Sequence, residues 1–479
     1  MNIPAPLRGI LPSGLFARGV TILAGSNALG QLIALAASPI LTRLYSPADF
    51  GLLAIYMALT TVFGVVVCLR YELAIPLPVL DTEGLSVALI ALGFVLTNSV
   101  LSVAGVWWWR EEIAVFFNMP TLSTVLWMFP FSLLLLGSFT VFRYWSVREK
   151  AFPAIGVARL QQVLSSITVQ ITGASFGATA LIGGQLANQG VGSISLGRRM
   201  LSHPELNSIT THGLIRIAKR FRRFPLITTW AALLNRGSAQ LPTMMFAALF
   251  GPVVAGLYAL SMRVINVPAG VMSDALGSVF LSSAVDAARQ STLEELTRNT
   301  YERLVIVTLP PLALVAAIAP EIFGWVFGAE WRAAGEFAQW IVILVYFAIV
   351  ASPLTLLFVV LEKQTHDFVF QLLLFITRVS TIYLGAIYGD ALLAIALYAV
   401  GSGVCYMLFL GWVAFQLNQG LKMILAPMIR ALGVAVVVVS PVIIVNIVPI
   451  KGAVGYFFGV LFSVMLVLFY LFRVVRKEF

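Results

Sequence analysis

Long runs of apolar residues dominate the chain and alternate with short polar segments. A helix of about 20 apolar residues crosses a hydrocarbon core about 30 Å thick, and windows of this kind occur fourteen times. The pattern therefore predicts an all-α polytopic membrane protein with about 14 transmembrane helices. The predicted spans are residues 18–42, 50–76, 84–109, 121–142, 153–173, 175–197, 225–250, 252–281, 303–327, 336–361, 368–388, 390–415, 428–449 and 453–473.

The basic residues concentrate on one set of loops. If the spans alternate across the membrane, the loop class that includes both termini carries 22 of the 30 Lys and Arg residues, and the other class carries four. The positive-inside rule then predicts that both termini are cytoplasmic. The longest loop, residues 198–224, is basic and is predicted to anchor the topology. Contact between this loop and anionic lipid head groups is the alternative interpretation.

The two halves of the chain carry related motifs. Residues 47–54 and 252–259 both read P-x-x-x-G-L-x-A, and Arg159 and Arg378 occupy comparable positions in their halves. These similarities favour an internal duplication of six helices, related by an axis along the membrane normal. The predicted organisation is an N-lobe at 1–197, a basic linker at 198–224, a C-lobe at 225–415 and two appended, lipid-facing helices at 416–479.

Three arginines lie deep inside apolar spans. Arg236, Arg263 and Arg378 are each roughly ten residues from a span end, which is about 15 Å along a helix. A cation at this depth costs about 3 kcal/mol or more on insertion scales. The acids available as counter-ions or coupling groups are few, namely Asp274 and, near a membrane edge, Glu72. The surplus of positive charge predicts a hydrated site for an anionic substrate.

Polar residues at helix-face spacing extend this candidate site. Such stripes must meet another helix or water, and they join helices more often than they contact a substrate. Arg159 lies only about six residues inside its span, so snorkelling to the surface is an equal alternative. Glu72 is expected to form a structural ion pair with Arg70. The remaining candidates are Arg18, Asn27 and Gln31 in the first span, Asn235 and Gln240 in the seventh, and Asn266 in the eighth.

Composition excludes several classes of protein. The chain is 60% hydrophobic and 10% charged, with a mean hydropathy of +0.97, which a soluble protein of this length could not tolerate. The net charge of +10 comes from residues that flank the spans, so it indicates topology and not a nucleic-acid partner. Cys68 and Cys405 lie in apolar segments and have no disulfide or metal-ligand spacing. No metal or cofactor is expected.

Three segments resemble a known family. The chain resembles Wzx-type lipid-linked oligosaccharide flippases of the multidrug/oligosaccharidyl-lipid/polysaccharide exporter superfamily. In the first half the resemblance lies in residues 39–52 (PILTRLYSPADFGL) and 70–78 (RYELAIPLP). In the second half it lies in residues 255–260 with Arg263 and Pro268. The resemblance implies two six-helix lobes, a central cationic cavity, alternating access and a polyprenyl-diphosphate-linked sugar as cargo. Related lipid II flippases bind the diphosphate with cavity arginines, which Arg18, Arg236 and Arg263 resemble.

The expected function is therefore transport without chemistry. The chain is predicted to flip an undecaprenyl-diphosphate-linked oligosaccharide to the outer leaflet of the bacterial inner membrane, for lipopolysaccharide O-antigen or exopolysaccharide. Membrane lipids, a polysaccharide polymerase and chain-length machinery are the expected partners. A cation-coupled multidrug antiporter is the first alternative, although it would need buried carboxylates. A glycan polymerase or ligase would need acidic groups on a large external loop, and a channel would need a pore loop.

Overall fold

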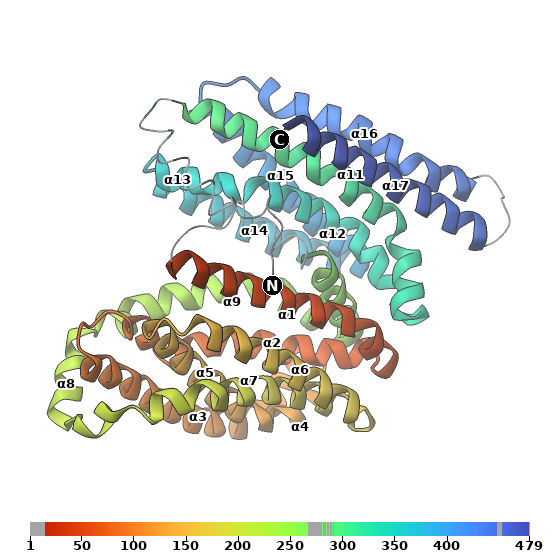
Figure 1. The fold of residues 1–479 in the computed structure, drawn as a ribbon. Coiled ribbons are helices and arrows are strands. Elements are labelled where there is room, and N and C mark those ends of the chain that lie inside the picture. Colours follow the sequence, from red (N-terminus) through yellow and green to blue (C-terminus); the bar gives the residue numbers. More distant parts are fainter. Residues whose placement is uncertain are drawn as a thin grey trace, which may run out of the picture. The chain divides into compact units, whose positions relative to one another are not determined.

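The computed structural model describes residues 15–266, 292–447 and 453–478, together with Phe280, Ala284, Ala287 and Gln290. Every regular element in this part of the chain is a helix (Figure 1). The chain forms two compact units, Met1–Gly256 and Leu257–Phe479. They are called the N-unit and the C-unit below, and each is described by itself.

The N-unit is a bundle of long helices, and the short basic helix α8 lies at one end of the bundle. Its main helices are α1 (Leu15–Leu44), α2 (Pro47–Val67), α3 (Asp81–Phe116), α4 (Pro120–Val125), α5 (Phe129–Arg148), α6 (Phe152–Thr172), α7 (Ala178–Leu201), α8 (Thr211–Arg220) and α9 (Thr229–Phe250). The short elements η2 (Tyr71–Ala74), η3 (Leu126–Met128), η4 (Ala174–Phe176), η5 (Pro204–Ser208) and η6 (Phe224–Thr228) connect them.

The C-unit repeats this organisation and adds two helices. A helix at Pro252–Asn266 crosses the boundary between the units. It is followed by α11 (Leu293–Phe327), η7 (Ala329–Trp331), α12 (Arg332–Ala351), η8 (Pro353–Leu356), α13 (Leu357–Val360), α14 (Gln364–Tyr388), α15 (Ala391–Gln416), α16 (Lys422–Ile447) and α17 (Ala453–Glu478).

The helices confirm the predicted fold class. Among the described residues, ten helices are long and apolar enough to cross a membrane. The helices α6, α7 and α9 are also of membrane-spanning length, with 21, 24 and 22 residues, but they are more polar and do not meet the same criterion of apolarity. The chain is therefore a multi-span helical membrane protein in which three long helices carry unusual polarity.

Two predicted spans end earlier than the apolar pattern suggests. The span predicted at 50–76 stops at Val67, because Leu69 and Arg70 adopt left-handed backbone conformations with φ of 48° and 62°. The span predicted at 336–361 breaks after Ala351, where Pro353 has no N–H to continue the helical hydrogen bonding. The first break lies at the charged residues Arg70 and Glu72 within an otherwise apolar stretch, and the second lies in a largely apolar run, so hydropathy alone does not place either break.

Corresponding pairs of helices pack against each other in the two units. In the N-unit α3 packs on α5, α5 on α7, and α6 on α7; in the C-unit α11 packs on α12, α12 on α15, and α14 on α15. This correspondence is what an internal duplication predicts. The predicted boundaries of the lobes and the linker remain a prediction, since the compact units divide after Gly256 and α9 packs on α2 in the N-unit.

The repeated P-x-x-x-G-L-x-A motif has a structural purpose. A Cβ atom at Gly51 would collide with the carbonyl oxygen of Pro252, and a Cβ atom at Gly256 would collide with that of Pro47. The starts of α2 and of the helix at Pro252–Asn266 therefore contact each other reciprocally, each through the glycine of its own motif. Only glycine permits this approach of two backbones.

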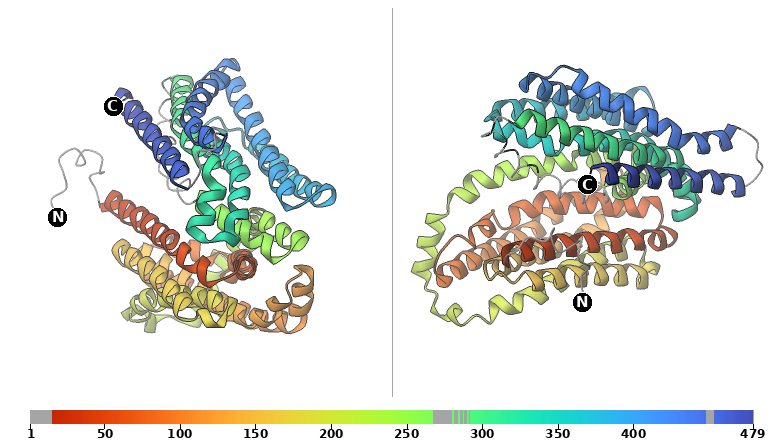
Figure 2. Two further views of the ribbon diagram at one scale, coloured as in Figure 1. Left: turned by 90° about the vertical axis from the view of Figure 1, so that its right-hand side faces the viewer. Right: turned by 45° about the horizontal axis from the view of Figure 1, so that its top comes forward.

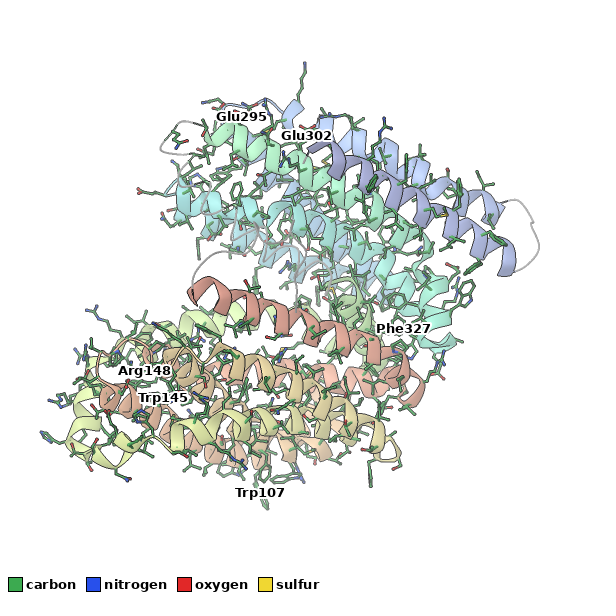
Figure 3. The ribbon with its side chains drawn as sticks, viewed as in Figure 1. Trp107, Trp145, Arg148, Glu295, Glu302 and Phe327 are labelled. Carbon is green, nitrogen blue, oxygen red and sulfur yellow. The ribbon has the colours of Figure 1, made fainter. Side chains whose placement is uncertain are left out.

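The two C-terminal helices cover one side of α11. Both α16 and α17 pack on α11 and on each other, and the views in Figure 2 show the pair running along it. Glu302 lies near the start of α11, at the opposite end from Phe327 (Figure 3). It forms an ion pair with Arg430 of α16, with Oε1 and Nη2 2.8 Å apart. The outward faces of both helices expose large apolar side chains such as Val436 and Phe469, as lipid contact requires.

Candidate functional site

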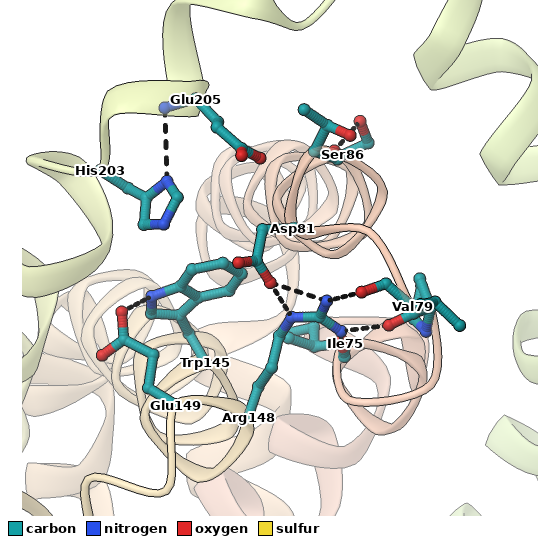
Figure 4. Close-up of polar contacts among 11 residues, drawn as sticks. Ile75, Val79, Asp81, Ser86, Trp145, Arg148, Glu149, His203 and Glu205 are labelled. Carbon is teal, nitrogen blue, oxygen red and sulfur yellow. Dashed lines mark hydrogen bonds and ion pairs between the residues drawn. The ribbon is translucent and has the colours of Figure 1, made fainter.

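The N-unit contains a buried arginine whose role is structural. Arg148, at the end of α5, lies beside Trp145 at the end of the bundle near α8 (Figure 3). Its Nε and Nη2 donate to one carboxylate oxygen of Asp81 at 3.0 and 2.8 Å, and its remaining hydrogens go to the carbonyls of Ile75, Pro78 and Val79 (Figure 4). A guanidinium has five N–H donors, and all five are used. Arg148 therefore fixes the connection between α2 and α3.

A second ionic contact near this connection is incomplete. Arg70 and Glu72 form the predicted ion pair, with Nη1 and Oε1 3.4 Å apart. Glu72 is 3% exposed, and within the described residues its Oε2 and the Nε of Arg70 have no hydrogen-bond partner. Burial raises the pKa of the Glu72 carboxyl, while the charges of Arg70 and Arg143 oppose this shift. This long, half-satisfied pair is consistent with a structural ion pair.

A polar cavity of about 210 Å³ lies inside the N-unit bundle. Four helices line it, namely α2, α5, α6 and α7. The side chains that face it are mainly polar, although the helices around it are embedded in an apolar bundle. The lining residues are Tyr56, Met57, Thr60, Thr61, Leu136, Phe139, Arg159, Gln162, Gln185, Asn188 and Gln189.

The α6–α7 contact explains how the polar side chains reach the cavity. Gln162 and Gln170 of α6 point into notches at Gly192 and Gly184 of α7, where a Cβ atom would collide with each amide. Both pairs are eight residues apart, or about two helical turns, so the antiparallel helices mesh in register. Small residues that admit polar side chains are typical of helix contacts within membranes.

Among the described residues that line this cavity, Arg159 is the only charged one. Its side chain is half-buried, and α1 crosses its stem at Gly30. Its buried Nε has no hydrogen-bond partner within the described residues, and neither do the Oε1 atoms of Gln162 and Gln189. The cavity thus contains an uncompensated cation beside two unsatisfied amide oxygens.

The other candidates in the N-unit are not brought into this cavity. Arg236 and Asn235 have exposed side chains on α9, and Gln240 is half-buried on the same helix. Arg236 forms no ion pair with any residue that the structure describes. On α1, Asn27 is exposed and Gln31 is half-buried, and Arg18 lies in α1 with its side chain outside the described residues.

The C-unit places Arg378 among tyrosines. Arg378 of α14 is half-buried, hydrogen-bonds the Tyr406 hydroxyl of α15 and acts electrostatically on Tyr258. The Tyr258 and Tyr398 rings meet edge to face, with centroids 6.4 Å apart. The buried Nε of Arg378 has no partner within the described residues. The hydrogen-bond partner of the Arg378 guanidinium is thus the hydroxyl of Tyr406, which is not an opposite charge.

A second cavity, of about 370 Å³, lies next to this cluster. Its polar lining includes Asn266, Gln371 and Tyr406, with Ser352 and Thr355 from the break after α12. Asn266 was predicted as a cavity residue, and Arg263 is half-buried one turn earlier on the same helix. Asp274 and Pro268 lie outside the described residues.

Several residues of these cavities were not among the predicted site residues. Tyr56 and Thr60 lie in the apolar run of α2, where no periodic pattern distinguishes the inward face. Gln162 and Gln189 belong to polar stripes at helix-face spacing, so that spacing was the signal that could have identified them. Neither cavity has a carboxylate among the lining residues that the structure describes, and this part of the chain includes no group of His, Cys, Asp and Glu that could hold a metal ion.

Comparison with solved structures defines the class of protein. The chain is similar to the lipid II flippase MurJ in an inward closed conformation, with a TM-score of 0.74 and 13% identity over 95% of this chain and 99% of that chain. It is also similar to an inward-facing MATE family multidrug resistance transporter of the MOP superfamily, with a TM-score of 0.50 and 14% identity over 83% and 94%. The chain therefore has the fold of this class of multi-span transporters.

A third similar structure shows variety in pocket charge within the class. It is a MOP superfamily transporter from Pyrococcus furiosus that is described as having a binding pocket of reversed polarity (TM-score 0.51, 13% identity, covering 88% of this chain and 99% of that chain). The model of the polysaccharide biosynthesis protein family matches residues 40–336, and this chain belongs to that family. No curated protein sequence matches the chain.

Proposed function

We propose that this protein is a flippase for an undecaprenyl-diphosphate-linked oligosaccharide. It would move the lipid from the cytoplasmic to the outer leaflet of the bacterial inner membrane, by alternating access and without a chemical reaction. The products would be surface polysaccharides, either lipopolysaccharide O-antigen or exopolysaccharide. A polymerase with its chain-length machinery would use the flipped lipid, and both termini of the flippase would be cytoplasmic.

The observation that carries this proposal is the combination of fold and family. A fold shared along nearly the whole chain with a lipid II flippase occurs in a member of a polysaccharide biosynthesis family. Lipid II flippase is the name of a protein that moves a lipid-linked saccharide, and polysaccharide synthesis needs lipid-linked saccharides. The same kind of cargo therefore suits both findings.

The arginines supply the chemistry that such a cargo needs. A diphosphate carries more than one negative charge, and guanidinium groups bind phosphate oxygens in pairs while remaining protonated. We assign the diphosphate mainly to Arg236 and Arg263, with Arg18, Arg159 and Arg378 assisting. Amides such as Asn235, Gln240, Asn266, Asn27 and Gln31 would hydrogen-bond the glycan. Asp274 and Glu72 would serve as counter-ions or coupling groups.

A cation-coupled multidrug antiporter is the second candidate, because a MATE transporter shares the fold. A cation-coupled antiporter of cationic drugs would benefit from carboxylates in its pockets. The polar groups described in the linings of the two cavities above are instead amides, hydroxyls and one arginine. The polarity of the lining therefore favours an anionic cargo.

Export of glycan by single variants tests the assignment. Arg236→Ala and Arg263→Ala should each reduce surface polysaccharide at least tenfold and cause lipid-linked oligosaccharide to accumulate, while the protein remains in the membrane at its normal level. Arg110→Ala is the matched control, since Arg110 is a half-exposed arginine that pairs with Glu111 at 3.3 Å, and it should export normally.

Two results would contradict the proposal. Normal export by both alanine variants at normal membrane levels would show that the assigned arginines do not bind the cargo. A strain that lacks the protein but keeps its surface polysaccharide and becomes sensitive to cationic drugs would instead support the antiporter.

A further inference from the structure

The cavity inside the N-unit contains a charge that no described residue balances. Arg159 is the only charged group among the described residues of the lining, and the neighbouring charge that acts on it is Arg143, another cation. A buried charge in a medium of low polarity is costly unless an opposite charge accompanies it. Water can complete the hydrogen bonds of a guanidinium, but it cannot neutralise the charge. The cavity therefore lacks a negative partner.

The size and number of the cavity's groups limit what that partner can be. The space of about 210 Å³ holds a small solute with several waters, but not a lipid diphosphate with its chains. One guanidinium balances one negative charge. The amides of Gln162 and Gln189, which are 1% and 9% exposed, have unpaired oxygens that require donors. Water around an ion, or the hydroxyls of a sugar, would provide such donors.

We propose that the N-unit cavity binds one small monovalent anion as the counter-charge of Arg159. The guanidinium contacts the anion, and the amides of Gln185, Asn188 and Gln189 complete its shell directly or through water. Two sources supply this chemistry. One is a halide ion from solution; the other is the carboxylate of an acidic sugar in the carried glycan, and this second source rests on the proposed function.

Neither of the two main residues assigned to the diphosphate, Arg236 and Arg263, is among the residues that line the cavity. Arg236 lies on α9, which is not among the helices that line the cavity, and its side chain is exposed. The anion would therefore remain bound when the diphosphate site is empty. An ion that binds only the folded protein stabilises it in proportion to the logarithm of its concentration, so its binding is measurable without any lipid substrate.

Thermal unfolding of the purified full-length protein in detergent tests the halide source. At matched ionic strength, replacing sodium sulfate with sodium chloride should raise the unfolding temperature saturably, by about 3 °C. Arg159→Gln keeps a polar side chain but removes the charge, and it should abolish this rise. Arg236→Gln is the matched control, an arginine of the same unit outside the cavity, and it should retain the whole rise.

A bromide derivative locates the ion. In crystals grown with sodium bromide, an anomalous peak should lie within about 4 Å of the Arg159 guanidinium. This measurement uses the wild-type protein, so it remains decisive if Arg159→Gln fails to fold. Gln189→Leu is the second variant, and it should raise the chloride concentration at half-saturation about fivefold by removing one neutral hydrogen bond.

The glycan source predicts a different set of results. Chloride would then have no effect and no bromide peak would appear, while sodium glucuronate would raise the unfolding temperature in an Arg159-dependent way and glucose would not. The proposal is overturned if neither anion stabilises the wild-type protein, or if Arg159→Gln keeps the full effect. Because no lipid is present, this test can fail while the export test succeeds, and the reverse is also possible.

Discussion

Arg148 and Arg159 are two arginines of one unit, eleven positions apart, with opposite surroundings. Arg148 directs all five N–H groups to a carboxylate and three carbonyls of the connection between α2 and α3 (Figure 4). Arg159 faces a cavity without a described acid and leaves its Nε unpaired. The difference shows that burial of a cation does not identify a binding site; the hydrogen bonds left unused by the protein do.

Removal of Arg148 should have the largest effect. Arg148→Ala leaves Asp81 without its partner and three carbonyls without donors, so it should lower the free energy of unfolding by about 3 kcal/mol and reduce the amount of protein in the membrane. Thermal unfolding and membrane yield measure this change. Arg148→Lys keeps the charge but lacks the planar guanidinium group, so its free energy of unfolding should lie between those of the wild type and Arg148→Ala. An alanine variant as stable as the wild type would show that the network carries no stability.

Removal of Arg159 should have a much smaller effect on stability. In sulfate medium without halide, Arg159→Leu replaces an uncompensated charge with an apolar side chain, and such replacements are often neutral or stabilising. The unfolding temperature should therefore stay within about 1 °C of the wild type or rise. A loss as large as that of Arg148→Ala would mean that Arg159 is structural, and the contrast between the two arginines would disappear.

Glu72 combines features of both arginines, because its Oε1 pairs with Arg70 and its Oε2 has no partner within the described residues. Its effect should be the smallest of the three and should appear only in the pH dependence of stability. Because burial raises the pKa of its carboxyl, the folded protein holds the proton more tightly than the unfolded chain does. The stability that this provides is complete below the ordinary pKa of a glutamate and is lost as the pH rises through the raised value. Unfolding temperatures of the wild type should therefore fall over this range relative to Glu72→Gln. Parallel pH profiles would contradict the shift.

Most of the fold could be predicted from the sequence, because a membrane-spanning helix needs only a sufficient apolar length. The breaks at Leu69–Arg70 and at Ser352–Pro353 could not be placed by hydropathy, since the segments on both sides of each break are largely apolar and the breaks depend on local backbone conformation. The helix α3 also extends to Phe116, seven residues beyond its predicted end, because helical hydrogen bonding continues past the hydrocarbon core.

The site was less accessible from the sequence. Gln162 in α6 and Gln189 in α7 follow helix-face spacing, whereas the contribution of Tyr56 and Thr60 to the N-unit cavity depends on how α2 is turned in the bundle. The hydrogen bonds of Arg148 could not be predicted either, because they also depend on the fold. Its carboxylate partner, Asp81, is 67 positions away in the chain, and without the fold Arg148 contributes only to the charge of a loop.

The reciprocal contact between Gly51 and Gly256 has an implication for the origin of the chain. Each motif presents a glycine to the residue that begins the other motif, which is the geometry of an isologous interface between two identical copies. A single ancestral half could have made this contact with a second molecule of itself before gene fusion joined them. Since both glycines face backbone atoms, a side chain at either position would break the contact in both copies at once.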